Sequence, residues 1–116
     1  FYINWTVEKN LVITDHWHGI TFSGARGTVI RDNIVVDILP GEPGPTWIRL
    51  AEHKDGTPSD GCTVTGNRAE SILVSPTATN TVVTDNRELS RAELYDLFEG
   101  PSRFDFRLRD PSFLAE

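Results

Sequence analysis

Four heptapeptides decide how this 116-residue chain is expected to fold: Asn4–Asn10 (NWTVEKN), Gly27–Asn33 (GTVIRDN), Gly61–Asn67 (GCTVTGN) and Asn80–Asn86 (NTVVTDN). Each begins with Asn or Gly, the residues that best tolerate a left-handed backbone, and each ends with Asn. All six asparagines of the chain lie at the first or last position of this phrase. The recurrence predicts one short structural unit that is repeated four times.

Within each heptapeptide, the side-chain pattern predicts a short strand between two tight corners. The fourth position is always Val or Ile and is expected to face a core, with the second position on the same side. The fifth position is polar and is expected to face water. The fourth-position residues are Val7, Ile30, Val64 and Val83, the second-position residues are Trp5, Thr28, Cys62 and Thr81, and the fifth-position residues are Glu8, Arg31, Thr65 and Thr84.

A second strand phrase follows each of the first three heptapeptides: Gly19–Phe22, Trp47–Leu50 and Ser71–Val74. Isoleucine occupies the second position of all three phrases, and a large apolar residue occupies the fourth. The terminal asparagines of successive heptapeptides are 23, 34 and 19 residues apart. This pattern is typical of a stacked coil with two strands in each turn and loops of different lengths.

Composition supports an all-β domain and excludes several classes of partner. Leu, Ile, Val and Phe number 32, enough to bury a core, and Val, Ile and Thr number 29, which favours strands. The net charge of −6 argues against nucleic acid, and no apolar run is long enough to span a membrane. Since the chain has no Met and starts with Phe1, we expect a piece of a longer chain or a processed product.

The repeat resembles that of the right-handed parallel β-helix superfamily, which includes pectate lyases, other polysaccharide-processing proteins and phage tailspikes. The resemblance covers residues 2–89 and implies an all-β fold, with three to four β-helix rungs over residues 1–89. It also implies an asparagine ladder, in which side-chain amides bond between rungs about 4.8 Å apart. A structural role is favoured over an active-site role because buried amides must be paired. The expected ladder residues are Asn10, Asn33, Asn67 and Asn86.

Residues 90–116 are expected to form a C-terminal cap. Ser90 and Glu93 have the spacing of a capping box, which predicts a helix over about 91–99 that is stopped by Gly100 and Pro101. The alternation over residues 104–109 predicts a half-buried strand, and the phrase Phe104–Ser112 resembles the closing phrase of many β-helix proteins. The helix and strand would cover the last rung. The N-terminal edge would be covered by upstream rungs of the same chain or by a homo-oligomer such as a trimer.

The first candidate site is the segment Asp15–Gly19 (DHWHG). His16 and His18 project the same way from an extended segment and are metal-ligand candidates with Asp15, although a solvated turn is the favoured interpretation because surface histidines are common. Trp17 and Trp47 are candidates for stacking on sugar rings, or for packing within a loop or core. Carboxylates from neighbouring loops could approach this segment. These carboxylates are Asp37, Glu42 and Glu70. Glu42, and Glu52 in the second segment below, are also candidates for ligand binding.

The second candidate site is the segment Glu52–Asp55 (EHKD). A polysaccharide lyase of this fold needs a base, for which His53 and Lys54 are candidates, and a cation beside the uronate carboxylate. Calcium could be held by Asp55 and Asp60. The alternative is that this charged run is a solvated loop tip.

The sequence therefore predicts a structural or binding module rather than a complete enzyme. It would be the C-terminal part of a larger surface or spike-type protein, located outside the cell, on the cell surface or on a virion. Its rung loops would bind polysaccharide without a cofactor. The alternative is the C-terminal end of a polysaccharide lyase or glycoside hydrolase. Its catalytic residues would lie mainly upstream, because no catalytic motif of the superfamily is matched here. A lyase would also be expected to use calcium as a cofactor.

Overall fold

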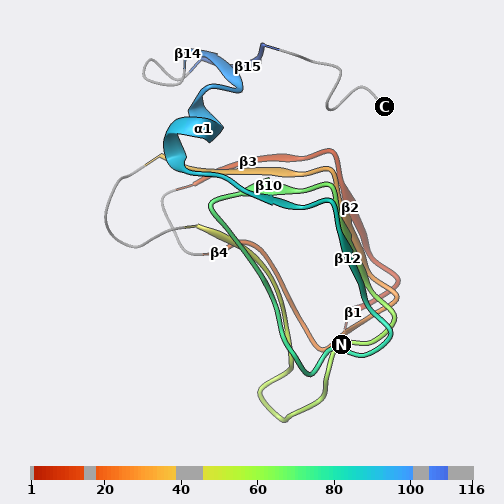
Figure 1. The fold of residues 1–116 in the computed structure, drawn as a ribbon. Coiled ribbons are helices and arrows are strands. Elements are labelled where there is room, and N and C mark those ends of the chain that lie inside the picture. The colour runs from red at the N-terminus through yellow and green to blue at the C-terminus, as the bar shows by residue number, and fades with distance from the viewer. Residues whose placement is uncertain (1, 15–17, 39–45, 101–104, 110–116) are drawn as a thin grey trace.

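The computed structural model describes residues 2–14, 18–38, 46–100 and 105–109. In this part of the chain the structure is built from short strands and one helix, and its principal sheets are parallel. Figure 1 looks along these sheets, so that the strands of each one overlie one another. The all-β expectation is confirmed at this level.

The heptapeptides form one parallel four-stranded sheet, which we call the heptapeptide sheet. Its strands pair in register in the order β12-β9-β6-β2, so that Val7, Ile30, Val64 and Val83 share one row. The corner residues that precede these strands have positive φ, from 48° at Asn80 to 64° at Gly61. The strands are β2 (Thr6–Glu8), β6 (Val29–Arg31), β9 (Thr63–Thr65) and β12 (Val82–Thr84).

A middle sheet begins directly after each terminal asparagine, in the order β13-β10-β7-β3. The sequence prediction of two strands in each repeat is therefore wrong, and residues 68–69, expected in a loop, form a strand. The apolar run of β7 is buried on both faces and has no alternation by which a strand could be recognised. The strands are β3 (Leu11–Thr14), β7 (Ile34–Asp37), β10 (Arg68–Ala69) and β13 (Arg87–Glu88).

The second strand phrases form a third sheet, in the order β11-β8-β4. Its register pairs Ile20 with Ile48 and Ile48 with Ile72, as the aligned phrases predict. A further short pair, β1 with β5, extends the parallel pairing to the start of the described chain. The strands are β4 (His18–Ser23), β8 (Trp47–Ala51), β11 (Ser71–Val74), β1 (Tyr2–Ile3) and β5 (Ala25–Arg26).

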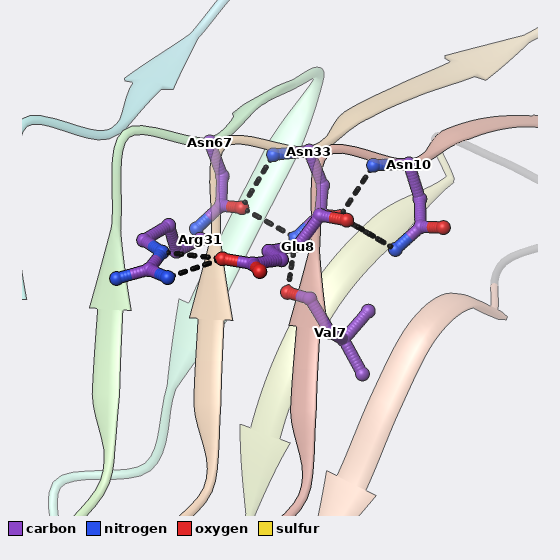
Figure 2. A network of polar contacts seen from close by, with 6 residues as sticks. All are labelled: Val7, Glu8, Asn10, Arg31, Asn33 and Asn67. Atoms are coloured by element: carbon purple, nitrogen blue, oxygen red, sulfur yellow. Dashed lines mark hydrogen bonds and ion pairs between the residues drawn. The ribbon is translucent and has the colours of Figure 1, made fainter. Parts of the chain in front are cut away.

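The terminal asparagines lie between the strands of the heptapeptide sheet and those of the middle sheet, and Figure 2 shows Asn10, Asn33 and Asn67 at this corner. Asn33 Oδ1 accepts hydrogen bonds from the backbone N and Nδ2 of Asn10, at 3.0 and 3.1 Å. The same pair of bonds joins Asn33 to Asn67 and Asn67 to Asn86, at 2.9–3.0 Å. Each Nδ2 also donates to a backbone carbonyl: that of Asn10 to Glu8 O in its own heptapeptide, and the other three to the fourth residue of the preceding heptapeptide, for example from Asn33 to Val7 O at 3.0 Å. These contacts satisfy amides that are fully buried at Asn33 and Asn67.

The interior between the three sheets is filled from the middle repeats. Ile30, Ile48 and Val64 are almost completely buried, as their positions predict. The expectation that every fourth-position residue faces a core fails at the end of the stack, where Val83 is 47% exposed. Trp5 is 54% exposed at the opposite end, because neither residue has a described repeat beyond it. Cys62 is a free cysteine, and it is buried, as its inward position predicts.

The C-terminal elements pack on the outer face of the middle sheet (Figure 1). Helix α1 (Arg91–Tyr95) starts with the predicted capping box, in which Ser90 and Glu93 bond reciprocally. It is shorter than the predicted 91–99, because Phe98 lies in strand β14 (Phe98–Gly100), antiparallel to β15 (Asp105–Leu108).

These elements do not cover the last repeat as the sequence prediction had it. Leu94 and Phe98 pack instead against Ile34 and Val36, whose side chains would otherwise face water. Strands β12 and β13 are exposed along their whole length. The outer apolar face of the middle sheet thus explains where the C-terminal elements lie.

Candidate functional site

The outer face of the third sheet carries a cluster of His18, Thr21, Trp47 and Arg49, which we call the Trp47 cluster. Ile48 and Leu50 point into the core, so Trp47 and Arg49 point outward from β8. Trp47 Nε1 donates to Thr21 Oγ1 at 3.1 Å, and the same oxygen lies 3.1 Å from His18 Nδ1. The rings of His18 and Trp47 meet edge to face, with centroids 5.1 Å apart. The Arg49 guanidinium carbon lies 5.4 Å from the Trp47 ring centroid.

A β-bulge at Gly19 places His18 in this cluster. The register of β4 against β8 shifts between His18 and Ile20, which pair with the consecutive residues Trp47 and Ile48. A side chain at Gly19 would collide with Val35 and would lie 2.9 Å from Thr46 Cγ2 and from the Trp47 carbonyl oxygen. The glycine is therefore required for the close approach, and the bulge turns the imidazole onto the outer face.

The cluster combines an aromatic surface with donors of positive or neutral character. Arg49 is exposed, and its guanidinium offers a planar set of donors that suits a carboxylate. Leu73 occupies the same row as Thr21 and Arg49 on the neighbouring strand β11 and is also exposed. The face can thus hold an extended ligand that is apolar on one side and anionic at its edge. Of the predicted site residues, the structure brings together His18 and Trp47, whereas Asp15, His16, Trp17 and Glu42 lie outside the described residues.

Arg49 and Thr21 were missed by sequence reasoning. The available signal was the period-two rule, because Arg49 follows Trp47 by two residues in a predicted strand and so shares its face. Thr21 follows from the alignment of Ile20 with Ile48, which puts Thr21 beside Arg49. The register between the predicted strands was therefore sufficient to place Thr21 and Arg49 on the same face as Trp47.

A second candidate site is an open cleft of about 580 Å³ lined by Tyr2, Ser23, His53 and Lys54. Tyr2 meets Phe22 edge to face at 5.2 Å, so its ring closes the end of the core beside the cleft. His53 Nδ1 lies 3.1 Å from Asp55 Oδ1, within a loop in which Glu52 and Lys54 are exposed. The two predicted base candidates thus share one cleft at the N-terminal end of the sheets.

The predicted calcium ligands Asp55 and Asp60 both hold loops in place. Asp55 Oδ1 accepts the Thr57 N–H at 2.9 Å, and the bonds from Thr57 lower the pKa of the Asp55 carboxyl. Asp60 Oδ1 accepts bonds from Thr79 Oγ1 at 2.7 Å and Asn80 Nδ2 at 2.9 Å, which lower its pKa. Within residues 2–14, 18–38, 46–100 and 105–109, no three His, Cys, Asp or Glu side chains are grouped so as to hold a metal ion.

Asp37 and Glu70 approach each other through Arg91 rather than through the Asp15–Gly19 segment. Arg91 Nη2 lies 3.3 Å from Asp37 Oδ2, and Arg91 Nε lies 3.5 Å from Glu70 Oε1. Arg91 Nε also donates to the Asp37 carbonyl at 3.1 Å. Burial raises the pKa of Glu70, which the nearby Asp37 carboxylate raises further and Arg91 opposes. This cluster fastens α1 to the middle sheet.

Comparison with known proteins gave no match. No protein-family model matches the sequence, and neither curated proteins nor solved structures showed significant similarity to it. Among the described helical residues, none form a segment long and apolar enough to cross a bilayer.

Proposed function

We propose that this chain is part of a right-handed parallel β-helix that binds an acidic polysaccharide on the outer face of its third sheet. The proposal of a β-helix is supported by the return of the chain to the same three parallel sheets in each of the middle repeats, and by the asparagine bonds at one corner. The superfamily resemblance of the heptapeptides agrees with it. The β-helix would present its strands as a flat, rigid platform in which the strands of neighbouring rungs lie about 4.8 Å apart.

The observation that carries the binding proposal is the Trp47 cluster. A sugar ring buries its C–H face against an indole, while Arg49 pairs with the carboxylate of a uronate residue. His18 supplies a second donor on the same face. The chain carries a net charge of −6, so a local guanidinium and imidazole on an outer face favour a specific anionic ligand over general attraction.

The same proposal places the module in a larger surface or spike-type protein, outside the cell or on a virion. Acidic polysaccharides of cell walls and capsules are the ligands that such a position would expose. Neither nucleic acid nor membrane is a proposed partner. No cofactor is required for binding.

Titration of the chain with polygalacturonate and with neutral dextran, followed by calorimetry, tests the binding proposal. We expect binding of the acidic polymer and a loss of about tenfold in affinity for R49A and for W47A. R87A, which removes an exposed arginine from another sheet, is the matched control and should bind like the parent chain. The proposal fails if the acidic polymer does not bind, or if R49A and R87A bind equally well.

A second candidate function is lyase or hydrolase activity, favoured by the cleft that brings His53 and Lys54 together. His53 would then act as the base that removes the proton beside a uronate carboxylate. Release of unsaturated uronate products, with and without calcium, tests this alternative. Activity that H53A abolishes and R49A only weakens would establish it, whereas uronate polymers left intact would eliminate it.

A further inference from the structure

We propose that the two ends of the sheet stack bind each other, so that a second copy of this chain stacks head to tail on the first. The leading edge consists of β2, β3 and β4, and the trailing edge consists of β12, β13 and β11. Both edges present parallel strands with main-chain groups that face outward, although the Ile72 N–H of β11 already donates to Glu88 Oε2 at 3.0 Å. This inference rests on the observed pairing and not on polysaccharide binding. Upstream rungs of a longer chain would pair with the same leading edge, so the second copy is proposed as the occupant in their place.

The asparagine bonds give the stack a direction. Each asparagine donates its backbone N–H and Nδ2–H forward to Oδ1 of the next asparagine along the chain. At the trailing edge, the backbone N–H of Asn86 has no acceptor within the described part of the chain. At the leading edge, Asn10 Oδ1 has no donor there. A second copy whose Asn10 follows Asn86 would continue the row with both groups satisfied.

The corner residues of the two edges carry complementary charges. Lys9 and Asp85 occupy the sixth heptapeptide position, with φ of 55° and 58°. The residues between them in this row are Asp32 and Gly66, and the Asp32 carboxylate reaches over the corner of the next repeat, against Gly66. In a stack, Asp85 would lie next to Lys9 of the second copy in this row, and the two side chains carry opposite charges. Because Lys9 has a Cβ where Gly66 leaves room for Asp32, the Asp85 carboxylate would lie beside the Lys9 side chain rather than over its backbone.

The apolar rows of the core also continue from one edge to the other. Val83, 47% exposed, would meet Val7 of the second copy, whose row it already shares. Ile72 lies in the row of Ile20, and Val74 lies in the row of Phe22, which is already buried and meets the Tyr2 ring edge to face. The stack would therefore bury Val83 at the trailing edge and the rings of Tyr2 and Trp5 at the leading edge.

The bulky and small side chains are distributed in a complementary way. The leading edge has the exposed rings of Tyr2 and Trp5, which contact each other edge to face. The trailing edge has Thr81 at the position equivalent to Trp5. Large residues facing small ones allow two surfaces to interdigitate. The partner that satisfies the donors, charges and apolar rows together is this chain's own leading edge.

Sedimentation velocity over a range of protein concentrations, with charge-reversal variants, tests the stack. We expect concentration-dependent assembly of the parent chain, and an apparent dissociation constant raised about tenfold in K9E and in D85K, because each places like charges together. The double variant K9E/D85K restores the opposite pair and should recover assembly. E99K is the control, since Glu99 is exposed in β14, which packs on the outer face of the middle sheet and on neither edge. A chain that stays monomeric at all concentrations overturns the proposal, as does assembly that ignores both reversals.

Register-specific cross-linking distinguishes the stack from non-specific aggregation. The in-register row of Thr6, Val29, Thr63 and Val82 predicts that Thr6 of one copy lies beside Val82 of the other, at a spacing that a disulfide can join. Oxidised T6C/V82C should form a ladder of linked chains, and a mixture of T6C with V82C should form dimers and no larger species. Linked dimers in either single variant alone would overturn the head-to-tail arrangement. Cys62 is buried and can remain in place.

Discussion

At the scale of single residues, buried amides determine how tightly neighbouring repeats are joined. Asn33 is fully buried and exchanges hydrogen bonds with Asn10, Asn67 and the Val7 carbonyl. Removing its side chain would leave several buried donors and acceptors without a partner. A buried donor or acceptor without a partner costs more stability than its hydrogen bond contributes. Substitution in the middle of the asparagine row should therefore destabilise the fold more than substitution at its end.

We therefore expect N33A to lower the free energy of unfolding by about 3 kcal/mol. The control is N10A at the exposed end of the same row, where lost bonds are replaced by water and the loss should be below about 1 kcal/mol. Urea denaturation of both variants measures the difference. Equal losses in N33A and N10A would contradict the argument from burial.

Glu70 is the residue whose ionisation should oppose folding. Its pKa in the folded chain is raised above the ordinary value of 4.5, chiefly by burial, so the folded chain holds this proton more tightly than the unfolded chain does. The free energy of unfolding contributed by Glu70 therefore falls as pH rises from 4.5 through its raised pKa, and is recovered as pH falls again.

The variant E70Q removes this titration, so E70Q should gain stability relative to the parent chain as pH rises through that window. Parallel denaturation series from pH 4 to pH 8 measure the difference between the two proteins, which cancels the other titrating groups. E99Q is the control, because Glu99 is an exposed carboxylate in β14 that takes no part in the Arg91 cluster. A difference that stays constant with pH would refute the assignment to Glu70.

At the scale of elements, the bulge in β4 connects packing with the candidate site. Gly19 permits the approach of Val35 and Thr46, and the extra residue turns His18 toward Trp47. A strand without the bulge would bring a different residue beside Trp47. The geometry of the Trp47 cluster therefore depends on one residue that contacts no ligand.

G19A should lower the free energy of unfolding by about 1–3 kcal/mol, because its Cβ overpacks a closed contact. The same change should weaken binding of polygalacturonate by displacing His18. G56A is the control for the binding measurement, because nothing lies within 4 Å of a Cβ at Gly56; its stability is not compared, since the φ of 93° adds backbone strain of its own. Thermal unfolding and calorimetry give the two values. Unchanged affinity in a folded G19A would separate the bulge from the site.

The sequence predicted those elements whose side chains alternate or whose corners recur. The strands of the heptapeptide sheet and the register of Ile20 with Ile48 were readable in this way. Strand β7 was hidden because both of its faces are buried, one by the core and one by α1 and β14. Helix α1 was predicted too long because Leu97 and Phe98 fit helical spacing, whereas pairing with β15 places Phe98 in a strand. The bulge at Gly19 left no local signal.

At the scale of the whole molecule, the described chain is a stack in which each repeat contacts its neighbours. The radius of gyration is 14.2 Å, and the extents of the molecule are 42, 33 and 19 Å. Stability in such an arrangement is close to a sum of terms for single repeats and for the contacts between adjacent ones. The inner strands β6 and β9 have partners on both sides, whereas β2 and β12 have one each within the described residues.

Hydrogen exchange should therefore proceed from the ends inward. Amides of β6 and β9 are expected to exchange at least about tenfold more slowly than those of β12, because opening an inner strand breaks contacts on two sides. If copies stack head to tail, raising the protein concentration should slow exchange in β12 and β2 and leave β6 and β9 unchanged. The alternation of bonds in a parallel pair leaves every second amide of β12 facing outward, so the added protection should alternate along the strand. Uniform protection of β12, or protection that spreads over the whole chain, would indicate general association instead of an added strand.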